Sequence, residues 1–485
     1  MATPVHCGQN ARSMRVLLLN PPGPSGRPFV REGRCEQRLS SYAYRMLPIS
    51  LPSTAGSVRA KGHEVSIVDA CGPRDGASTL EGQVRSLRPE LVVVSVSTPT
   101  YAADVETIGR LRAWTDAHLT AIGVHVTALP EETLRGSQLD SVVRGEPEWT
   151  VTELAEMLAR GGDLGAVAGL SLRRGAGIVH NADRGFPDAL DELPPPARDL
   201  LPEEDYFLPI LNQPYTLVVP TRGCPHKCTY CTAPSYYGKK LRRREPRLVV
   251  DEMESIVRRG IVKDITMWSD TFTLDRRYVL DFCDELRSRE LDVRWMCNSR
   301  ADCLDPELAR VMRAAGCVGI SFGLESGVQE ILDRVEKGTT IEHGRAAVRA
   351  AKDAGIMTLG HFILGLPGET RETIRRTVAY AIDVDPDWAQ FYCATPLPGT
   401  ELRAQAEREE MIAGHNWSDL EFQRPSMATA ALSAEELERA RRRAYLAFYA
   451  RARVARRLAG RLRLRDLPKL GRQAASFVGS WVLDA

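Results

Sequence analysis

The 485-residue sequence has no long hydrophobic run, no secretory leader and no excess of charge of one sign. No stretch approaches the roughly 18 consecutive apolar residues of a membrane span, and residues 1–13 lack the apolar core of a secretory signal. The 64 basic and 63 acidic residues leave a net charge of +1, which favours neither nucleic acid nor an anionic surface as a partner. We therefore expect a cytoplasmic protein of two or three domains, without a membrane span.

The cysteines, in contrast, are numerous and partly clustered. The sequence has eleven, and because no secretory signal precedes them, a disulfide framework is not expected. Three of them, Cys224, Cys228 and Cys231, lie close together in TRGCPHKCTYC, residues 221–231. The other eight are scattered, and we interpret them as buried or incidental thiols: Cys7, Cys35, Cys71, Cys283, Cys297, Cys303, Cys317 and Cys393.

The first part of the chain alternates strand and helix patterns. Apolar runs at 15–22, 63–70 and 90–100, with weaker ones at 120–134 and 139–148, predict a parallel, doubly wound sheet over residues 14–150. The ligand crevice of such a Rossmann-like sheet lies at the carboxyl ends of its strands, where the sequence places Asn20, Asp69, Ser97, Thr98 and Gly123. These residues are also ordinary loop formers. A dinucleotide is not indicated, because no G-x-G-x-x-G follows the first strand.

Residues 151–210 have the composition of a junction. After a helix predicted at 150–160, the segment at 170–182 has the pattern of a β-hairpin. The acidic, proline-rich sequence DELPPPARDLLPEEDY then suits an exposed linker. A second domain is expected to start near residue 210.

A second alternation of strands and helices occupies residues 211–415. Six βα units predict a partial (β/α)6 barrel of the TIM type, which places its chemistry at the carboxyl ends of the strands. The cysteine cluster follows directly after the first of these strands. The strands are expected at 216–221, 264–270, 293–299, 317–326, 357–365 and 388–395.

A closed zinc site or a fully protein-ligated [4Fe-4S] cluster has four protein ligands, and three clustered thiolates are one short of that number. A [4Fe-4S] cluster held by Cys224, Cys228 and Cys231 leaves one iron open to a small molecule. A zinc site completed by His226 is the alternative, although no second ligand pair follows downstream. The spacing therefore favours an iron-sulfur cluster with an open iron.

The motif C-x-x-x-C-x-aromatic-C, with Tyr230 in the aromatic position, resembles the signature of the radical S-adenosylmethionine (AdoMet) superfamily. The resemblance covers about 200 residues and implies that the open iron binds the amino and carboxylate groups of AdoMet. Cleavage of AdoMet by one electron then gives a 5′-deoxyadenosyl radical. It also implies a flavodoxin- or ferredoxin-type electron donor and a small-molecule substrate.

The later strand ends are similar to the successive barrel motifs of this superfamily. By that resemblance, Glu325 and Ser326 in FGLESG contact the amine or ribose of AdoMet, and Arg300 pairs with its carboxylate. Ile363 to Gly365 in GHFILGLPGET give an apolar edge for adenine. By the same resemblance, Asp270 contacts the substrate and not AdoMet. Each of these residues taken alone is also a common ion-pair or capping residue.

The sequence over residues 14–150 resembles the cobalamin-binding domain that precedes the barrel in one subclass of the superfamily. The resemblance implies a cobalamin site near Ser97, Thr98 and Gly123. The D-x-H-x-x-G loop that supplies an axial histidine elsewhere is absent, since no histidine follows Asp69 in DACGPRDG. Members of the subclass exist with and without cobalamin, so both alternatives stay open.

Two reactions fit this subclass. The compact members that the sequence resembles, of the hopanoid ring-contraction and aminoglycoside dehydratase kind, favour radical dehydration or rearrangement of a polyol or aminosugar in natural-product (antibiotic) biosynthesis. A nicotinamide-dependent reductase would then act on the product. The alternative is a cobalamin-dependent C-methyltransferase. The candidates for general acid–base catalysis on the substrate are Tyr236, Tyr237, Asp270, His361 and Tyr392.

The C-terminal residues 416–485 are expected to be helical. Ser433 and Glu436 form a capping box, and the arginines that follow suit a solvated helix face. A methylthiolating or RNA-modifying enzyme of the same superfamily is disfavoured, because the chain shows neither an added RNA-binding module nor a basic face. A non-enzymatic iron-sulfur or corrinoid carrier is disfavoured by the complete set of barrel motifs.

Overall fold

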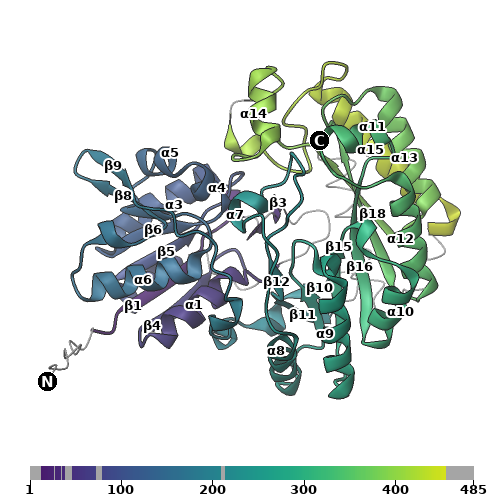
Figure 1. The fold of residues 1–485 in the computed structure, drawn as a ribbon. Coiled ribbons are helices and arrows are strands. Elements are labelled where there is room, and N and C mark those ends of the chain that lie inside the picture. Colours follow the sequence, from purple (N-terminus) through teal and green to yellow (C-terminus); the bar gives the residue numbers. More distant parts are fainter. Residues whose placement is uncertain are drawn as a thin grey trace, which may run out of the picture.

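The computed structural model describes residues 12–26, 28–33, 35–38, 46–72, 79–208, 213–414 and 416–454. Two α/β units lie side by side; the strands up to β9 (Gly177–His180) build the first, and those from β10 (Phe207–Leu208) onward build the second (Figure 1). No helix among the described residues is long and apolar enough to cross a membrane.

The first unit is a seven-stranded sheet in the order β4-β1-β5-β6-β7-β8-β9. Its first five strands are parallel, as predicted, because short runs such as LVVVS are buried on both faces. Their bounds are Arg15–Asn20 (β1), Glu64–Asp69 (β4), Leu91–Ser95 (β5), His118–Ile122 (β6) and Ser141–Val143 (β7).

Helices cover both faces of this sheet, as a doubly wound fold requires. One apolar layer packs under α1 (Ser50–Ala60) and α6 (Pro147–Ala159), and the other under α2 (Leu80–Leu87) and α3 (Tyr101–Trp114). Short helices α4 (Val124–Ala128) and α5 (Pro130–Arg135) follow β6.

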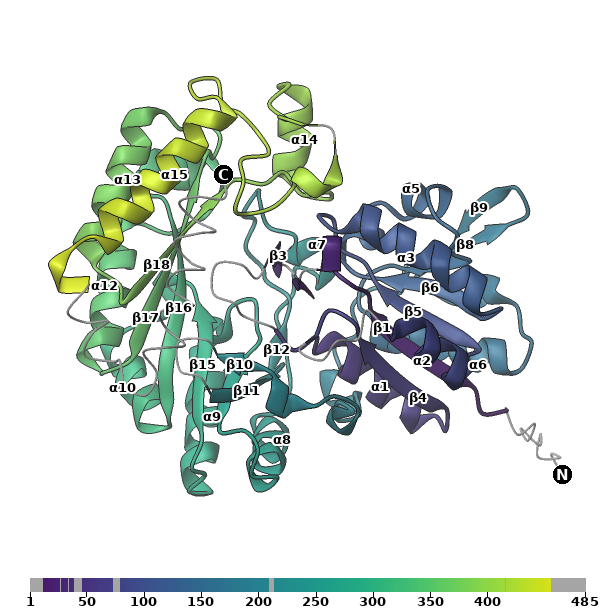
Figure 2. The same ribbon diagram turned by 180° about the vertical axis from the view of Figure 1, so that it is seen from behind.

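Two hairpins extend the first unit. The predicted hairpin forms β8 (Leu170–Arg174) and β9 (Gly177–His180), and it adds to the sheet by pairing antiparallel with β7. A second hairpin, β2 (Phe29–Glu32) with β3 (Cys35–Arg38), was not expected from the sequence. It lies where the two units meet (Figure 2).

The second unit is a curled sheet with helices on its outer side (Figure 2). All six predicted strands are present and parallel, in the order β11-β14-β15-β16-β17-β18, and the two-residue β10 pairs antiparallel at the edge. The strands span Phe207–Leu208 (β10), Gln213–Val218 (β11), Asp264–Met267 (β14), Arg294–Ser299 (β15), Cys317–Glu325 (β16), Met357–Leu364 (β17) and Trp388–Cys393 (β18).

Helices between these strands complete the partial barrel. They are α8 (Pro246–Arg258), α9 (Arg276–Ser288), α10 (Pro306–Ala314), α11 (Gln329–Arg334), α12 (Ile341–Asp353) and α13 (Arg371–Val384), and α14 (Glu401–Arg408) follows the last strand. The last described helix, α15 (Ala434–Tyr449), begins at Ser433, which forms the expected capping box with Glu436. The prediction for residues 455–485 lies outside the described residues.

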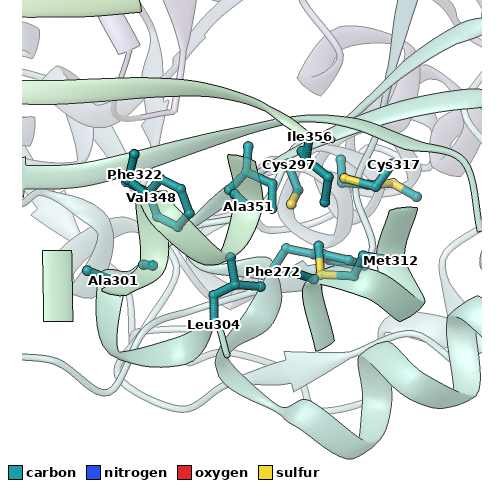
Figure 3. Packing of buried hydrophobic residues seen from close by; sticks show 14 of the residues in the cluster. Phe272, Cys297, Ala301, Leu304, Met312, Cys317, Phe322, Val348, Ala351 and Ile356 are labelled. Carbon is teal, nitrogen blue, oxygen red and sulfur yellow. The ribbon is translucent and has the colours of Figure 1, made fainter. Parts of the chain in front are cut away.

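The main core of the barrel unit lies between the sheet and its helices. Phe272, Phe282 and Trp295 meet edge to face, with ring centroids 5.4 to 5.6 Å apart. Cys297 and Cys317 pack in the same layer (Figure 3). Five of the eight scattered cysteines are buried and not in disulfides, which confirms the expectation for them: Cys71, Cys283, Cys297, Cys317 and Cys393.

Candidate active site

The three clustered cysteines lie on one loop, residues 223–241, which we call the cysteine loop. Two short strands, β12 (Thr221–Arg222) and β13 (Arg242–Arg243), pair at its base. Gly223 adopts φ +85°, and a Cβ there would lie 2.2 Å from the Lys240 carbonyl. Only glycine fits this turn, so the loop is closed tightly at its base.

Backbone contacts hold the loop against the barrel. Thr229 N–H donates to the Val335 carbonyl at 3.1 Å, and Leu402 N–H donates to the Thr229 carbonyl at 2.8 Å. The Gly223 N–H donates to Asp270 at 3.2 Å. The predicted substrate residue Asp270 therefore also supports the start of the cysteine loop.

Cys224, Cys228 and Cys231 are not in disulfides and are partly exposed. Two buried cations, Arg300 and Lys337, interact electrostatically with Cys228. Partly exposed thiols in an electropositive setting are those that ionise and bind metals. The loop therefore fits the ligand set of an iron-sulfur cluster, while the described residues hold no group of three His, Cys, Asp or Glu side chains arranged for a single metal ion.

A buried ion pair that the sequence did not reveal lies beside the loop. Lys337 donates to Glu325 at 2.7 Å, and its Nζ lies 3.4 Å from the Tyr230 hydroxyl. Burial disfavours the charged form of Lys337, but the charges of Glu325 and Cys228 raise its pKa. Glu325 itself has φ +57° at a bulge in β16. This backbone conformation is uncommon for glutamate and marks a position with a specific task.

Arg300 stands at the neighbouring strand end. Its guanidinium is buried and pairs with Asp302 through two hydrogen bonds of 3.0 Å. Although burial disfavours its charge, Asp302 and Cys228 raise the pKa of Arg300. His226, the alternative zinc ligand, is half-buried, and burial, together with Arg300, lowers its pKa. Two buried cations, Arg300 at a strand end and Lys337 after helix α11, are thus close to the cysteine loop.

Ser326 does not join this group. Its hydroxyl lies 3.1 Å from that of Thr377 on α13 and accepts from the Val328 N–H at 3.3 Å. The residue is fully buried and stabilises the turn after β16. Its contact with AdoMet stays a prediction.

His361 and Tyr392 lie on adjacent strands, and their rings stack with centroids 5.6 Å apart. The Tyr392 hydroxyl hydrogen-bonds Gln390. Ile363, on the same strand as His361, packs in an apolar cluster that includes Tyr230. An apolar edge next to the cysteine loop is therefore present where the sequence predicts adenine.

Tyr236 and Tyr237 end the helix α7 (Ala233–Tyr236) that follows Cys231. Their rings meet edge to face at 4.7 Å. Burial, and next the charge of Glu32 in the unexpected hairpin, raise the pKa of both phenols. Both tyrosines are therefore neutral hydroxyls at the junction of the two units. A small pocket beside the loop is lined by Val219, Thr221, Arg222, Tyr237, Trp268, Ser269 and Asp270.

Glu369 braces the turn after β17. Its carboxyl accepts from the N–H groups of Gly365 and Leu366 at 2.6 and 3.1 Å, and Gly365 adopts φ +88°. Burial raises the pKa of Glu369 to about 8. Because folding favours its neutral form, the resulting stability is complete below pH 4.5 and is lost as the pH rises through about 8.

Glu369→Gln is therefore expected to gain stability relative to the wild type between pH 5 and 8. The gain reaches at most about 1.4 kcal/mol per pH unit, because glutamine mimics the neutral carboxyl. Urea unfolding at several pH values measures it, and Glu330→Gln, at an exposed position on α11, is the control. Equal pH slopes for the wild type and Glu369→Gln would contradict the prediction.

The strand ends of the first unit carry a buried polar network. Arg31 pairs with Asp104 at 2.7 Å and donates to Thr100 at 3.0 Å. The Ser97 hydroxyl lies 2.7 Å from that of Thr100. The backbone N–H of Thr98 donates to Glu36 of the hairpin at 3.3 Å, and burial raises the pKa of Glu36 to about 8. The predicted cobalamin loop at Ser97 and Thr98 is therefore rigid and polar.

His125 lies at the same edge, two residues after Gly123, within the strand end that the sequence places in the crevice. It is fully buried, its Nδ1 lies 3.3 Å from the Thr98 hydroxyl, and its Nε2 has no hydrogen-bond partner among the described residues. Burial lowers its pKa to about 3, so the ring is neutral. Tyr101 and Trp417 contact the ring at centroid distances of 4.4 and 5.4 Å. An unpartnered polar atom at strand ends fits a domain that takes a large polar ligand.

Trp417 comes from the C-terminal part of the chain, yet it packs on the first unit. Its indole N–H donates to Glu132 at 3.1 Å, and the Arg403 guanidinium lies over its ring at 5.1 Å. This C-terminal segment therefore closes over the strand ends that carry Thr98 and His125.

Gly123 allows the end of β6 to approach the backbone of Val96, which follows β5. It has φ +128°, and a Cβ there would lie 2.2 Å from the Val96 carbonyl. We expect Gly123→Ala to cost at least about 1–3 kcal/mol of unfolding free energy, because alanine meets both strain and a clash. Thermal unfolding measures the loss. Gly62→Ala is the matched control, since Gly62 has φ +86° with open space around it; an equal loss there would show that the close approach has no effect.

Comparisons with known proteins agree with this arrangement. Residues 218–381 match the Radical SAM superfamily, and residues 38–155 match the B12 binding domain. An uncharacterized methyltransferase of Pyrococcus horikoshii is 32% identical over 84% of this chain and 88% of its own length. An anaerobic magnesium-protoporphyrin IX monomethyl ester cyclase of Rubrivivax gelatinosus is 29% identical over 87% and 75%.

A solved structure shares the fold of both units. The radical AdoMet methyltransferase TsrM of Kitasatospora setae, with cobalamin and a [4Fe-4S] cluster bound, superposes with a TM-score of 0.69. It is 20% identical, and the match covers 94% of this chain and 90% of that one.

Proposed function

The chain belongs to the radical AdoMet superfamily, in the subclass with an N-terminal B12-binding domain, and we propose that it is a cobalamin-dependent methyltransferase acting on carbon in a small molecule. Its cofactors are a [4Fe-4S] cluster, AdoMet and cobalamin. The sequence favoured dehydration or rearrangement, with methyl transfer as the alternative. The relatives support the alternative better, because the Pyrococcus protein, similar over both units, is a methyltransferase by name.

One observation carries the proposal. Helix α4, which follows the predicted cobalamin residue Gly123, packs against α7, which follows the predicted cluster ligand Cys231. The loops assigned to the two cofactors are therefore neighbours. A methyl group carried by one cofactor and a radical generated by the other both act on a single substrate carbon only when the two sites adjoin.

When bound, the cluster and AdoMet supply hydrogen abstraction, and cobalamin supplies the transferable methyl group. The chain's own residues hold and orient these groups. Cys224, Cys228 and Cys231 hold the cluster, and Lys337 and Glu325 offer paired charges to the carboxylate and amine of AdoMet. Ile363 gives adenine an apolar edge.

The cobalamin site is assigned to the strand ends of the first unit. Ser97, Thr98 and Gly123 form its rigid rim, and the neutral His125 offers an unpartnered nitrogen. The hairpin and Trp417 cover this edge and exclude water from it. A flavodoxin- or ferredoxin-type protein would supply electrons.

We propose that the substrate lies beside the cysteine loop, next to Asp270 and Tyr237. The carboxyl of Asp270 and the hydroxyl of Tyr237 suit a polar, hydroxylated molecule of the polyol or aminosugar class. In this proposal Asp270 holds a substrate hydroxyl, and Tyr237, whose pKa burial raises, keeps its proton to donate.

The proposal is tested with protein reconstituted without oxygen. Hydroxocobalamin is added, unbound ligand is removed by gel filtration, and AdoMet labelled in its methyl group is supplied with dithionite and a panel of polyols and aminosugars. We expect about one cobalamin per chain, S-adenosylhomocysteine, 5′-deoxyadenosine and label in the product. Formation of 5′-deoxyadenosine by protein that retains no cobalamin would instead support direct dehydration or rearrangement.

A further inference from the structure

Four buried charged residues join the base of the cysteine loop to the first unit. Arg222 and Arg242 stand on β12 and β13, directly before and after the loop. Glu146 and Glu148 stand at the start of α6 in the first unit. All four residues are less than 8% exposed, so the contact is shielded from water. We call Glu146, Glu148, Arg222 and Arg242 the interdomain ion lattice.

Each arginine of the lattice makes a bidentate contact with one glutamate. Arg222 donates two hydrogen bonds to Glu148, one of 3.1 Å, and lies 3.5 Å from Glu146. Arg242 donates two hydrogen bonds to Glu146, one of 3.0 Å. Two parallel hydrogen bonds fix the angle of a guanidinium as well as its distance. The lattice therefore sets the orientation of both ends of the loop.

Each side of the lattice is anchored in turn. Arg242 also donates to the carbonyls of Pro187 and Tyr237 at 2.9 and 2.8 Å. The two glutamates lie at the N-terminus of α6, where the helix dipole favours negative charge, and α6 packs on α1 in the core of the first unit. The carboxylates are therefore held by a rigid domain, not by a loop.

Arg222 precedes Cys224 by two residues, so the lattice fixes the backbone next to the first cysteine of the loop. A loop whose two ends are fixed presents its thiols in one arrangement, and residues that orient metal ligands affect metal retention. We propose that the interdomain ion lattice positions the cysteine loop, so that retention of the cluster depends on the B12-binding domain. This inference rests on the cluster assigned under the proposed function.

The test compares three variants of the reconstituted full-length protein. Glu148→Gln keeps the shape but removes one charge, and the double variant Glu148→Leu/Arg222→Met removes one pair without leaving an unpaired charge. Asp188→Asn is the control, because Asp188 pairs with Lys240 of the same loop at 2.6 Å but both side chains are more than 60% exposed. The measured quantity is the rate at which an iron chelator removes iron, with circular dichroism to confirm folding.

We expect Glu148→Gln and the double variant to lose iron about 10-fold faster than the wild type, and Asp188→Asn to match the wild type. If the double variant does not fold, the rate of iron loss from Glu148→Gln alone tests the inference. Wild-type rates in the folded lattice variants would overturn the inference and leave the proposed function standing. A wild-type protein that binds no cluster would overturn both.

Discussion

Replacing Cys228 with alanine is expected to abolish AdoMet cleavage. Cys228 is partly exposed, and the buried cations Arg300 and Lys337 both interact with it electrostatically. A [4Fe-4S] cluster with one open iron needs three thiolate ligands from the loop. With two thiolates left on the loop, the cluster cannot be held with one open iron. The iron and sulfide content after reconstitution, and 5′-deoxyadenosine formed with dithionite, should both fall to background.

Cys303→Ala is the matched control for this loss. Cys303 lies beside the same charged group, with its Sγ 3.7 Å from an Asp302 oxygen, and it is also partly exposed. Burial, and then the Asp302 charge, raise its pKa to about 12, so it stays a neutral thiol. We expect Cys303→Ala to keep its iron and its activity. Full activity in Cys228→Ala would remove the basis of the assigned cluster.

Replacing Lys337 with methionine is expected to destabilise the barrel unit and to weaken AdoMet binding. The change leaves Glu325 as a buried, unpaired carboxylate, since both side chains are 7% exposed. Removing one partner of such a pair costs about 3–5 kcal/mol. Urea unfolding measures the cost, and equilibrium dialysis with AdoMet measures the affinity of the reconstituted protein.

Two further variants separate stability from binding. Lys263→Met breaks an ion pair with Asp292 whose side chains are 61% and 82% exposed, so it should cost less than about 1 kcal/mol. The double variant Lys337→Met/Glu325→Gln should recover part of the stability, because no charge is left unpaired, but none of the AdoMet affinity. Wild-type affinity in the double variant would show that the pair serves the fold alone.

The sequence predicts the strands of both units well, because each is a short apolar run with a clear end. For example, β5 is a continuous apolar run, and apolar residues alternate with small or polar ones along β16. Both patterns are recognised without knowledge of a distant partner. The cysteine loop is equally evident, since its three thiols are local in the chain. The hairpin at residues 29–38 was missed because its buried charges face partners such as Thr98 and Asp104, far along the sequence.

The same reason explains the residues missed at the site. Lys337 follows a short helix and contacts Glu325 and Tyr230 only through the fold. Arg222 and Glu148 are 74 positions apart, and no sequence pattern links them. Ser326 stays a prediction, because a hydroxyl at a strand end is as suited to a turn as to a ligand. Methyl transfer came second because the front segment resembles compact members of the subclass that do not methylate, and the pattern of strands and loops does not correct that inference.

The packing of Trp417 on the first unit has a consequence for how the protein is made. Chains emerge from the ribosome with the N-terminus first, so the front sheet, which ends at β9 (Gly177–His180), can form early. The contact between Trp417 and His125 waits until almost the whole chain has been synthesised. A nascent chain therefore lacks the contact of Trp417 with the strand ends at Thr98 and His125 until the barrel has been translated.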